Sequence, residues 1–132
     1  MKYLLDTNAC VTFLRDRDSL VGQKLKSVRY ADVVLCAVVK AELYYGVQRS
    51  AFPARNLAQL NDFLMNFGSL PFDDRAAEEY GRLRAELARA GTPIGPNDLL
   101  IAAIALAHHL TLVTHNLSEF SRVAGLALED WE

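Results

Sequence analysis

The chain has 132 residues, of which 52% are hydrophobic and 23% are charged. This length and composition predict a single folded domain over residues 1–132 and exclude a disordered chain. The formal net charge is −2, so the chain lacks the basic excess that gives a protein general affinity for nucleic acid, and any such binding must be local. No apolar run is long enough to cross a bilayer, and the N-terminus lacks the hydrophobic stretch of a secretory signal. We therefore expect a cytoplasmic protein.

Short strand-like runs alternate with helical patterns along the chain. Strands are predicted at Tyr3–Leu5, Val33–Cys36, Ser69–Phe72 and Leu110–Thr114, with a weaker one at Leu126–Leu128. Such alternation is typical of an α/β fold in which helices cover a parallel sheet. We expect a central parallel sheet of four to five strands.

Three helices can be placed from spacing and from end signals. Between Ala54 and Phe67, leucines and phenylalanine recur at steps of three and four residues. A second helix begins at Asp73 or Asp74 and ends at Gly91. A third begins at Pro96 and is so apolar that we expect it to be buried on most sides.

Two cysteines, Cys10 and Cys36, are isolated in the sequence. The absence of a C-x-x-C spacing argues against a disulfide framework and against a zinc module. Free cysteine is among the most frequently buried residue types, so both are expected to pack in the core.

Three acidic residues lie beside segments that form the core. Asp6 closes the first strand, Glu42 interrupts the apolar run from residue 38 to residue 47, and Asp98 opens the third helix. Functional groups of open α/β sheets gather at the carboxyl ends of strands, so these acids could line one crevice. Two carboxylates 4 Å apart repel by about 4 kcal/mol at an effective dielectric constant of 20. A hard divalent ion would neutralise them, which predicts a magnesium site that activates water against a phosphodiester.

Structural explanations exist for the same acids. Asp6 has the position of a helix N-cap, and Asp98 has that of a first-turn acid stabilised by the helix dipole. Both explanations are compatible with a metal-binding role. Glu42 has no opposite charge one turn toward the C-terminus, where Gly46 stands instead. That glycine leaves open space beside the carboxylate, although local helix packing explains it equally well.

The sequence resembles that of the PIN-domain endoribonucleases and, within this family, the VapC-like toxins of toxin-antitoxin pairs. The resemblance covers nearly the whole chain. The matching pieces are Leu5–Asn8, Ala41–Gly46, Gly95–Ala102, Leu112–Asn116 followed by Glu119–Phe120, and Leu128–Trp131. Each is weak alone, but several in order and at family-like spacing are specific. The resemblance implies a three-layer α/β/α PIN-like domain.

The resemblance also implies roles for particular residues. Metal binding and catalysis fall to Asp6, Glu42 and Asp98, with supporting roles for Thr7, Asn8, Thr114 and Asn116. Many family members have aspartate where this chain has Asn116. The amide oxygen of Asn116 can still serve as a metal ligand. Glu119, three residues on, would supply the missing charge if its segment forms a helical turn.

The implied activity is hydrolysis of RNA by an endoribonuclease that uses Mg²⁺ or Mn²⁺. Transfer RNA or another structured RNA is the expected substrate, and a cognate VapB-like antitoxin and a homodimer are the expected partners. The sequence does not identify the residues that bind RNA. Two alternatives remain open: a catalytically weak subunit whose acids mainly bind the antitoxin, and a structure-specific nuclease that acts on DNA.

A basic stripe offers one possible RNA contact. Arg75, Arg82 and Arg89 recur every seven residues along the second predicted helix. However, Glu78 and Glu86 each lie four residues from Arg82. We therefore favour a solvated face with weak ion pairs.

Overall fold

The computed structural model describes residues 1–132, and its centre is a five-stranded parallel sheet. The strands are β1 (Tyr3–Leu5), β2 (Val33–Cys36), β3 (Gly68–Leu70), β4 (Thr111–Val113) and β5 (Leu128–Glu129). Their order is β3-β2-β1-β4-β5, and every neighbouring pair is parallel. The predicted α/β fold and parallel sheet are confirmed.

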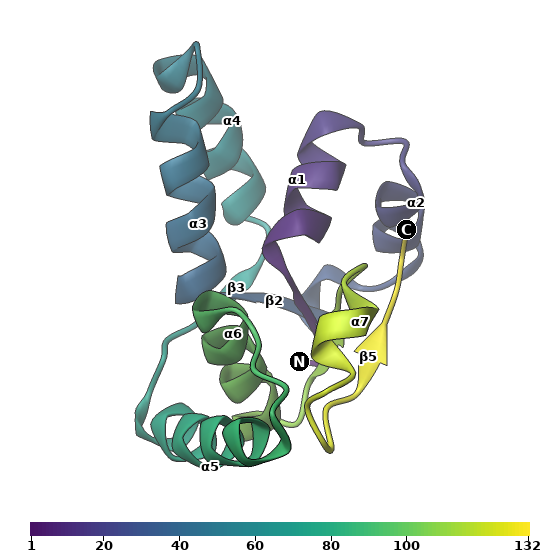
Figure 1. The fold of residues 1–132 in the computed structure, drawn as a ribbon. Coiled ribbons are helices and arrows are strands. Elements are labelled where there is room, and N and C mark those ends of the chain that lie inside the picture. The colour runs from purple at the N-terminus through teal and green to yellow at the C-terminus, as the bar shows by residue number, and fades with distance from the viewer.

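Helices cover the sheet on both sides (Figure 1). Above it in that view lie four helices, α1 (Thr7–Arg15), α2 (Leu20–Ser27), α3 (Ala37–Gln48) and α4 (Pro53–Leu64). Below it lie α5 (Asp74–Ala90) and α6 (Pro96–Ala107), while the short α7 (Leu117–Phe120) follows β4. A 3₁₀ turn, η1 (Tyr30–Asp32), leads into β2. This arrangement is the expected three-layer α/β/α architecture.

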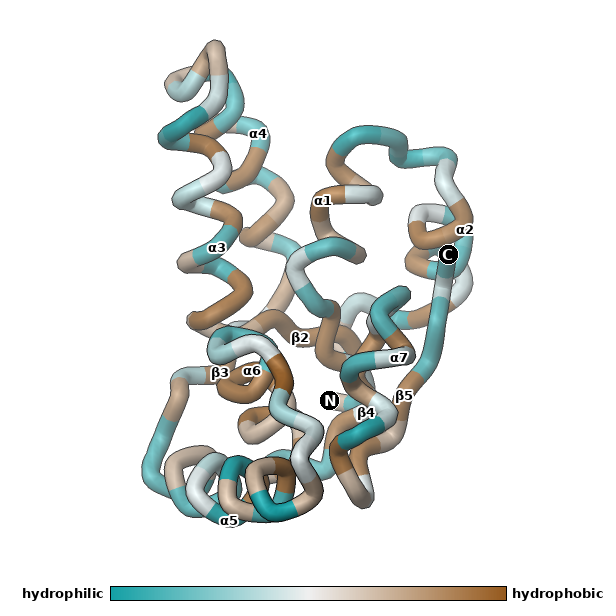
Figure 2. Tube along the Cα trace, in the orientation of Figure 1, coloured by the Kyte–Doolittle hydropathy of each residue, from teal (hydrophilic) through white to brown (hydrophobic).

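The core consists of the central strands and the inner faces of the helices. Every residue of β1 and β2 is buried, as expected for strands that are covered on both faces. Seven of the twelve residues of α6 are buried, which confirms the prediction from its apolar sequence. Figure 2 shows the contrast between the hydrophobic strands and the hydrophilic residues of α5.

Several element boundaries differ from the prediction. The first predicted helix ends at Leu64 rather than Phe67, because Asn66 turns its side-chain amide back onto the carbonyl oxygens of Asp62 and Phe63. Phe67 is nevertheless buried, with its ring centroid 5.1 Å from that of Phe63. The periodic pattern therefore identified a core position, but it extended the helix by one turn.

Two strands are also displaced along the sequence from their predicted positions. The third strand begins at Gly68 and ends at Leu70, two residues before the predicted end. The last strand occupies Leu128–Glu129 rather than Leu126–Leu128. Its position is fixed by pairing, since Leu112 lies opposite Leu128 and Val113 opposite Glu129. Pairing partners are not visible in the local pattern of a short strand.

The helix α5 has the predicted end signals. The Asp73 carboxylate accepts a hydrogen bond from the Ala76 amide at the N-terminus, and Gly91 adopts the left-handed conformation with φ 70° at the C-terminus. The predicted ion pair of Arg82 with Glu86 is present. The pairing with Glu78 is wrong, because Arg82 pairs with Glu79 instead.

The prediction that both cysteines pack in the core is confirmed. Cys10 and Cys36 are free thiols with no exposed surface. Trp131 is buried and packs edge-on against Tyr3, with ring centroids 5.1 Å apart, so it anchors the C-terminal segment. No helix of the chain is both long enough and apolar enough to span a membrane.

Strand order reverses at the carboxyl ends of β1 and β4. From β1 the chain crosses to β2 on one side, whereas β4 lies on the other side of β1. The carboxyl ends of β1 and β4 therefore flank the point where strand order reverses, which is where open α/β sheets bind ligands. Asp6 follows β1 at this point, and Thr114 follows β4.

Candidate functional site

Asp6 is the buried centre of this edge. Its side chain accepts a hydrogen bond from the Ala9 amide at 2.8 Å and so caps α1, while the residue is only 4% exposed. Burial raises the pKa of Asp6, and the hydrogen bonds from Thr114 and Ala9 partly oppose this rise. The negative charges of Glu132 and Glu42 raise the pKa further. Capping and a place in a carboxylate cluster therefore coincide.

Glu42 reaches the same edge from the second turn of α3. Its Oε1 accepts a hydrogen bond from Thr7 Oγ1 at 2.5 Å, and its Oε2 is 3.5 Å from Asn97 Nδ2. These contacts connect α3 to the first turns of α1 and α6, so the N-termini of two other helices converge on the Glu42 carboxylate. Asn97 has no role in the sequence prediction, although it directly precedes Asp98 at a helix N-terminus.

Asp98 lies half-buried in the first turn of α6. Its pKa is raised to about 7, first by burial and then by its hydrogen bond with Glu119. The charges of Glu119, Glu42 and Asp6 contribute further to the rise. An aspartate responds in this way when negative neighbours surround it without a compensating cation.

Glu119 completes the group from α7. Its Oε1 accepts a hydrogen bond from the Gly95 amide at 2.5 Å, and its Oε2 accepts one from Asn116 Nδ2 at 2.6 Å. The Gly95 contact is the main reason that the pKa of Glu119 is lowered. A Cβ atom at Gly95 would lie 3.4 Å from Glu119 Oε1 and 3.6 Å from Asp98 Oδ2. The helical turn on which the Glu119 hypothesis depended is therefore present and brings Glu119 beside Asp98.

The remaining predicted residues have different surroundings. Thr114 is buried, and its hydroxyl oxygen accepts a hydrogen bond from the Asn116 backbone amide at 3.0 Å. Asn116 directs its side-chain amide group to Glu119, so it positions that carboxylate in this structure. Asn8 is exposed and makes no side-chain hydrogen bond, so the structure does not bring it into these contacts.

Electrostatics distinguish this cluster from an ordinary charged surface. None of the ion pairs in the chain involves Asp6, Glu42, Asp98 or Glu119. Four acids thus gather at one end of the strands without forming an ion pair, and the nearby cation that acts on them is Arg122, whose charge helps to lower the pKa of Glu119. All of their donor atoms are oxygen, which is the ligand set that Mg²⁺ and Mn²⁺ take. The donor chemistry of these residues therefore suits a hard divalent cation.

Comparison with known proteins decides the family. The PIN-domain model matches residues 3–126, which includes every residue of this carboxylate cluster. The chain belongs to the PIN-domain family. The PIN fold expected from the sequence resemblance is confirmed. The expected function of the chain, an endoribonuclease of the VapC type, is confirmed at the level of the family.

Curated relatives of this PIN domain are VapC proteins of almost equal length. The "tRNA(fMet)-specific endonuclease VapC" of Salmonella typhimurium is 37% identical over 131 residues, which cover 99% of this chain and 98% of the relative. The "Ribonuclease VapC2" of Rickettsia felis is 39% identical over 133 residues, covering 100% of this chain and 99% of the relative.

Solved structures agree with the PIN assignment. One chain of the DNA-bound VapBC structure from Salmonella typhimurium superposes with a TM-score of 0.95 at 37% identity, covering 100% of this chain and 99% of that chain. The corresponding chain of VapBC2 from Rickettsia felis, bound to a promoter DNA fragment, gives a TM-score of 0.94 at 37% identity and covers both chains fully.

Proposed function

We propose that this PIN domain is a metal-dependent endoribonuclease toxin in which Asp6, Glu42 and Asp98 bind Mg²⁺ or Mn²⁺, with Glu119 as a fourth carboxylate. The observation that carries the proposal is the convergence of four carboxylates, none of which forms an ion pair with a lysine, arginine or histidine. When bound, the ion would activate a water molecule and neutralise charge on the phosphodiester.

The chain itself contributes the positions of the carboxylates. The Ala9 amide and the Thr114 hydroxyl hold Asp6, and the Thr7 hydroxyl holds Glu42. Without a cation, Asp98 retains a proton near neutral pH because burial and Glu119 raise its pKa to about 7. A divalent ion would displace that proton and leave Asp98 as an anionic ligand.

Glu119 can supply the negative charge that the site lacks because residue 116 is Asn rather than Asp. The Asn116 side chain donates to Glu119 Oε2, and the Gly95 amide donates to Glu119 Oε1. These two donors hold the carboxylate beside Asp98 and favour its ionised form. We therefore assign Glu119 the place of the charge that an aspartate at residue 116 would provide.

The substrate we propose is initiator transfer RNA. Two relatives, from Salmonella typhimurium and Shigella flexneri, are described as tRNA(fMet)-specific endonucleases and are 37% and 39% identical to this chain. The decisive test incubates an initiator tRNA transcript with the protein and Mn²⁺. We expect discrete fragments that disappear with EDTA and with the D98N variant.

The same cleavage test is applied to residue 6, where Asn is again the preferred substitution. Its side-chain oxygen can still accept the capping hydrogen bond, whereas Ala would remove the cap. Folded D6N or D98N protein that cuts as fast as the unmodified chain would refute the proposed metal-binding roles.

The partner we propose is a VapB-like antitoxin, and we propose a homodimer of this chain within the complex. The support comes from relatives whose structures are described as VapBC complexes. Co-expression with the neighbouring antitoxin frame tests this partner by co-purification. If D98N abolishes cleavage but retains the antitoxin, the acids serve catalysis. If D98N loses the antitoxin as well, the chain is better described as a binding subunit.

A further inference from the structure

A large pocket opens beside the carboxylate cluster. It has a volume of about 820 Å³ and lies among α1, α3, α4 and the start of α6. Thr7, Glu42 and Asn97 line one end, and these are the residues joined by hydrogen bonds at the cluster. Arg15 and Arg49 also line the pocket. The pocket is therefore continuous with the proposed catalytic site but contains positive charge that the site lacks.

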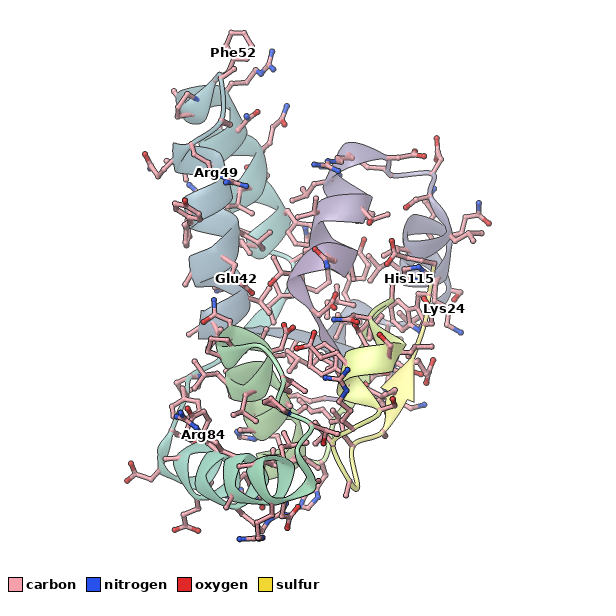
Figure 3. All side chains as sticks on the ribbon, in the orientation of Figure 1. Lys24, Glu42, Arg49, Phe52, Arg84 and His115 are labelled. Carbon is pink, nitrogen blue, oxygen red and sulfur yellow. The ribbon has the colours of Figure 1, made fainter.

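Helix geometry gives the pocket two chemically different ends. Glu42, Tyr45, Gly46 and Arg49 follow the i, i+3, i+4, i+7 spacing, so they share one face of α3. Arg49 lies about 10 Å along the helix axis from Glu42 at 1.5 Å per residue. Figure 3 shows this order along α3, with Glu42 near the sheet and Arg49 farther from it.

The same order appears on α1. Thr7 is in its first turn and Arg15 is its last residue, and both line the pocket. Acidic and metal-binding groups therefore occupy the end near the sheet, and two arginines from different helices occupy the other end.

Both arginines lack a partner of opposite charge. The side chains of Arg15 and Arg49 take part in none of the ion pairs or side-chain hydrogen bonds of the chain, unlike Arg82 on α5. Arg49 lies over the ring of Tyr45, 5.2 Å from its centroid, and Tyr45 is 65% exposed. An unpaired guanidinium group beside an exposed aromatic ring, as at Arg49, is a combination that binds single-stranded nucleic acid.

We propose that this pocket binds the single-stranded RNA segment adjoining the scissile phosphate. Arg15 and Arg49 contact its phosphates, and Tyr45 contacts a base. The inference rests on the proposed ribonuclease function and adds the residues that hold the substrate. Charge complementarity favours RNA as the occupant, because two arginines without ion-pair partners line the pocket and phosphodiesters carry the negative charge that they would bind.

The first test measures binding separately from cleavage. Fluorescence anisotropy with a fluorescein-labelled initiator tRNA transcript is recorded in EDTA, so the result does not depend on metal-dependent chemistry. We expect R15Q/R49Q to bind about 100-fold more weakly, at about tenfold per charged contact. Two lost contacts to single-stranded phosphates should also reduce the slope of log K against log salt by about 1.4.

A matched control removes two arginines elsewhere. R84Q/R89Q takes the same charge from exposed positions on α5 that line no part of this pocket. Figure 3 shows Arg84 on that helix, away from Glu42 and Arg49. We expect this variant to bind RNA within about twofold of the unmodified chain, since surface charges outside the contact contribute little.

A second pair of variants changes the shape of the pocket without changing its charge. A Cβ atom at Gly46 would meet nothing within 4 Å, so G46A leaves the pocket open, whereas G46F places a ring inside it. We expect G46A to retain RNA binding and G46F to weaken it about tenfold or more. Circular dichroism and thermal unfolding of both variants verify that they are folded.

Each outcome bears on the proposal. Equal RNA binding by R15Q/R49Q and the unmodified chain would overturn it, as would equal binding by G46F and G46A. If R15Q/R49Q keeps RNA affinity but loses the co-purified antitoxin, the pocket binds protein and the RNA assignment is wrong. If unmodified protein binds RNA through the arginines but cuts none, the pocket assignment stands and the proposed enzymatic function fails.

Discussion

Mn²⁺ affinity is expected to fall steeply with acidity because a proton on Asp98 competes with the metal. The pKa of Asp98 is raised to about 7 by burial, by Glu119 and by the other nearby acids. A carboxyl group with that pKa is about 97% protonated at pH 5.5 and about 10% protonated at pH 8. Since the ion binds the anionic form, its apparent affinity should be about 30-fold weaker at pH 5.5 than at pH 8.

The sign follows from the direction of the shift. Raising the folded-state pKa of Asp98 means that, between its ordinary value of 3.8 and about 7, the metal-free folded chain binds more protons than the unfolded chain. The free energy of unfolding of the metal-free chain therefore falls as pH rises through that window, and the stability that the Asp98 proton contributes at low pH is lost. A bound cation reverses the loss, so Mn²⁺ should raise the melting temperature more at pH 8 than at pH 5.5. The raised pKa of Asp6 acts in the same direction.

Isothermal titration calorimetry at the two pH values measures the effect directly. Titrations in buffers with different ionisation enthalpies would also report the proton released on binding. E119Q is the informative control, because losing the charge beside Asp98 should lower the Asp98 pKa and flatten the pH dependence. A Mn²⁺ affinity that differs by less than about threefold between pH 5.5 and pH 8 would refute the competition with the Asp98 proton.

Three further predictions concern single positions. D6N should keep stability within about 0.5 kcal/mol while D6A loses about 1 kcal/mol, because only Asn preserves the cap on α1; urea unfolding measures both, and both should lack RNA cleavage. G22A should lose about 1–3 kcal/mol in the same assay, because its Cβ would lie 2.0 Å from the Arg17 carbonyl oxygen. The pKa of His115 should exceed 6.5, because its Nδ1 lies 3.0 Å from Asp130 Oδ2 and that carboxylate stabilises the imidazolium. NMR titration should show the pKa falling in D130N, and the stabilising pair is lost as pH rises through the folded-state pKa.

These three predictions have clear contrary results. Equal unfolding free energies for D6N and D6A would show that the cap contributes nothing. Unchanged stability of G22A would mean that the loop before α2 moves aside at no cost. An identical His115 titration with and without the Asp130 carboxylate would exclude that group as the cause of the shift.

The sequence alone determined the fold class and most of the cluster. Apolar strands separated by helical periodicity imply a parallel sheet, since a buried strand must be covered on both faces. Asp6 and Asp98 were recognisable because an acid beside a core segment at a helix N-terminus has a local signature in capping and dipole chemistry. Glu42 was recognisable because it interrupts an apolar face without a local counter-charge.

Only the tertiary structure decided which groups meet. Glu119 is 21 residues from Asp98 in sequence, and its hydrogen bond to Gly95 is made possible by the return of β4 to the side of β1. The position of β5 likewise depends on pairing with β4, which a short apolar run does not specify. Arg15 and Arg49 carry no local signal because each is an ordinary charged residue at a helix end. Their common pocket arises from packing of α1 against α3, and such long-range contacts are absent from any local pattern.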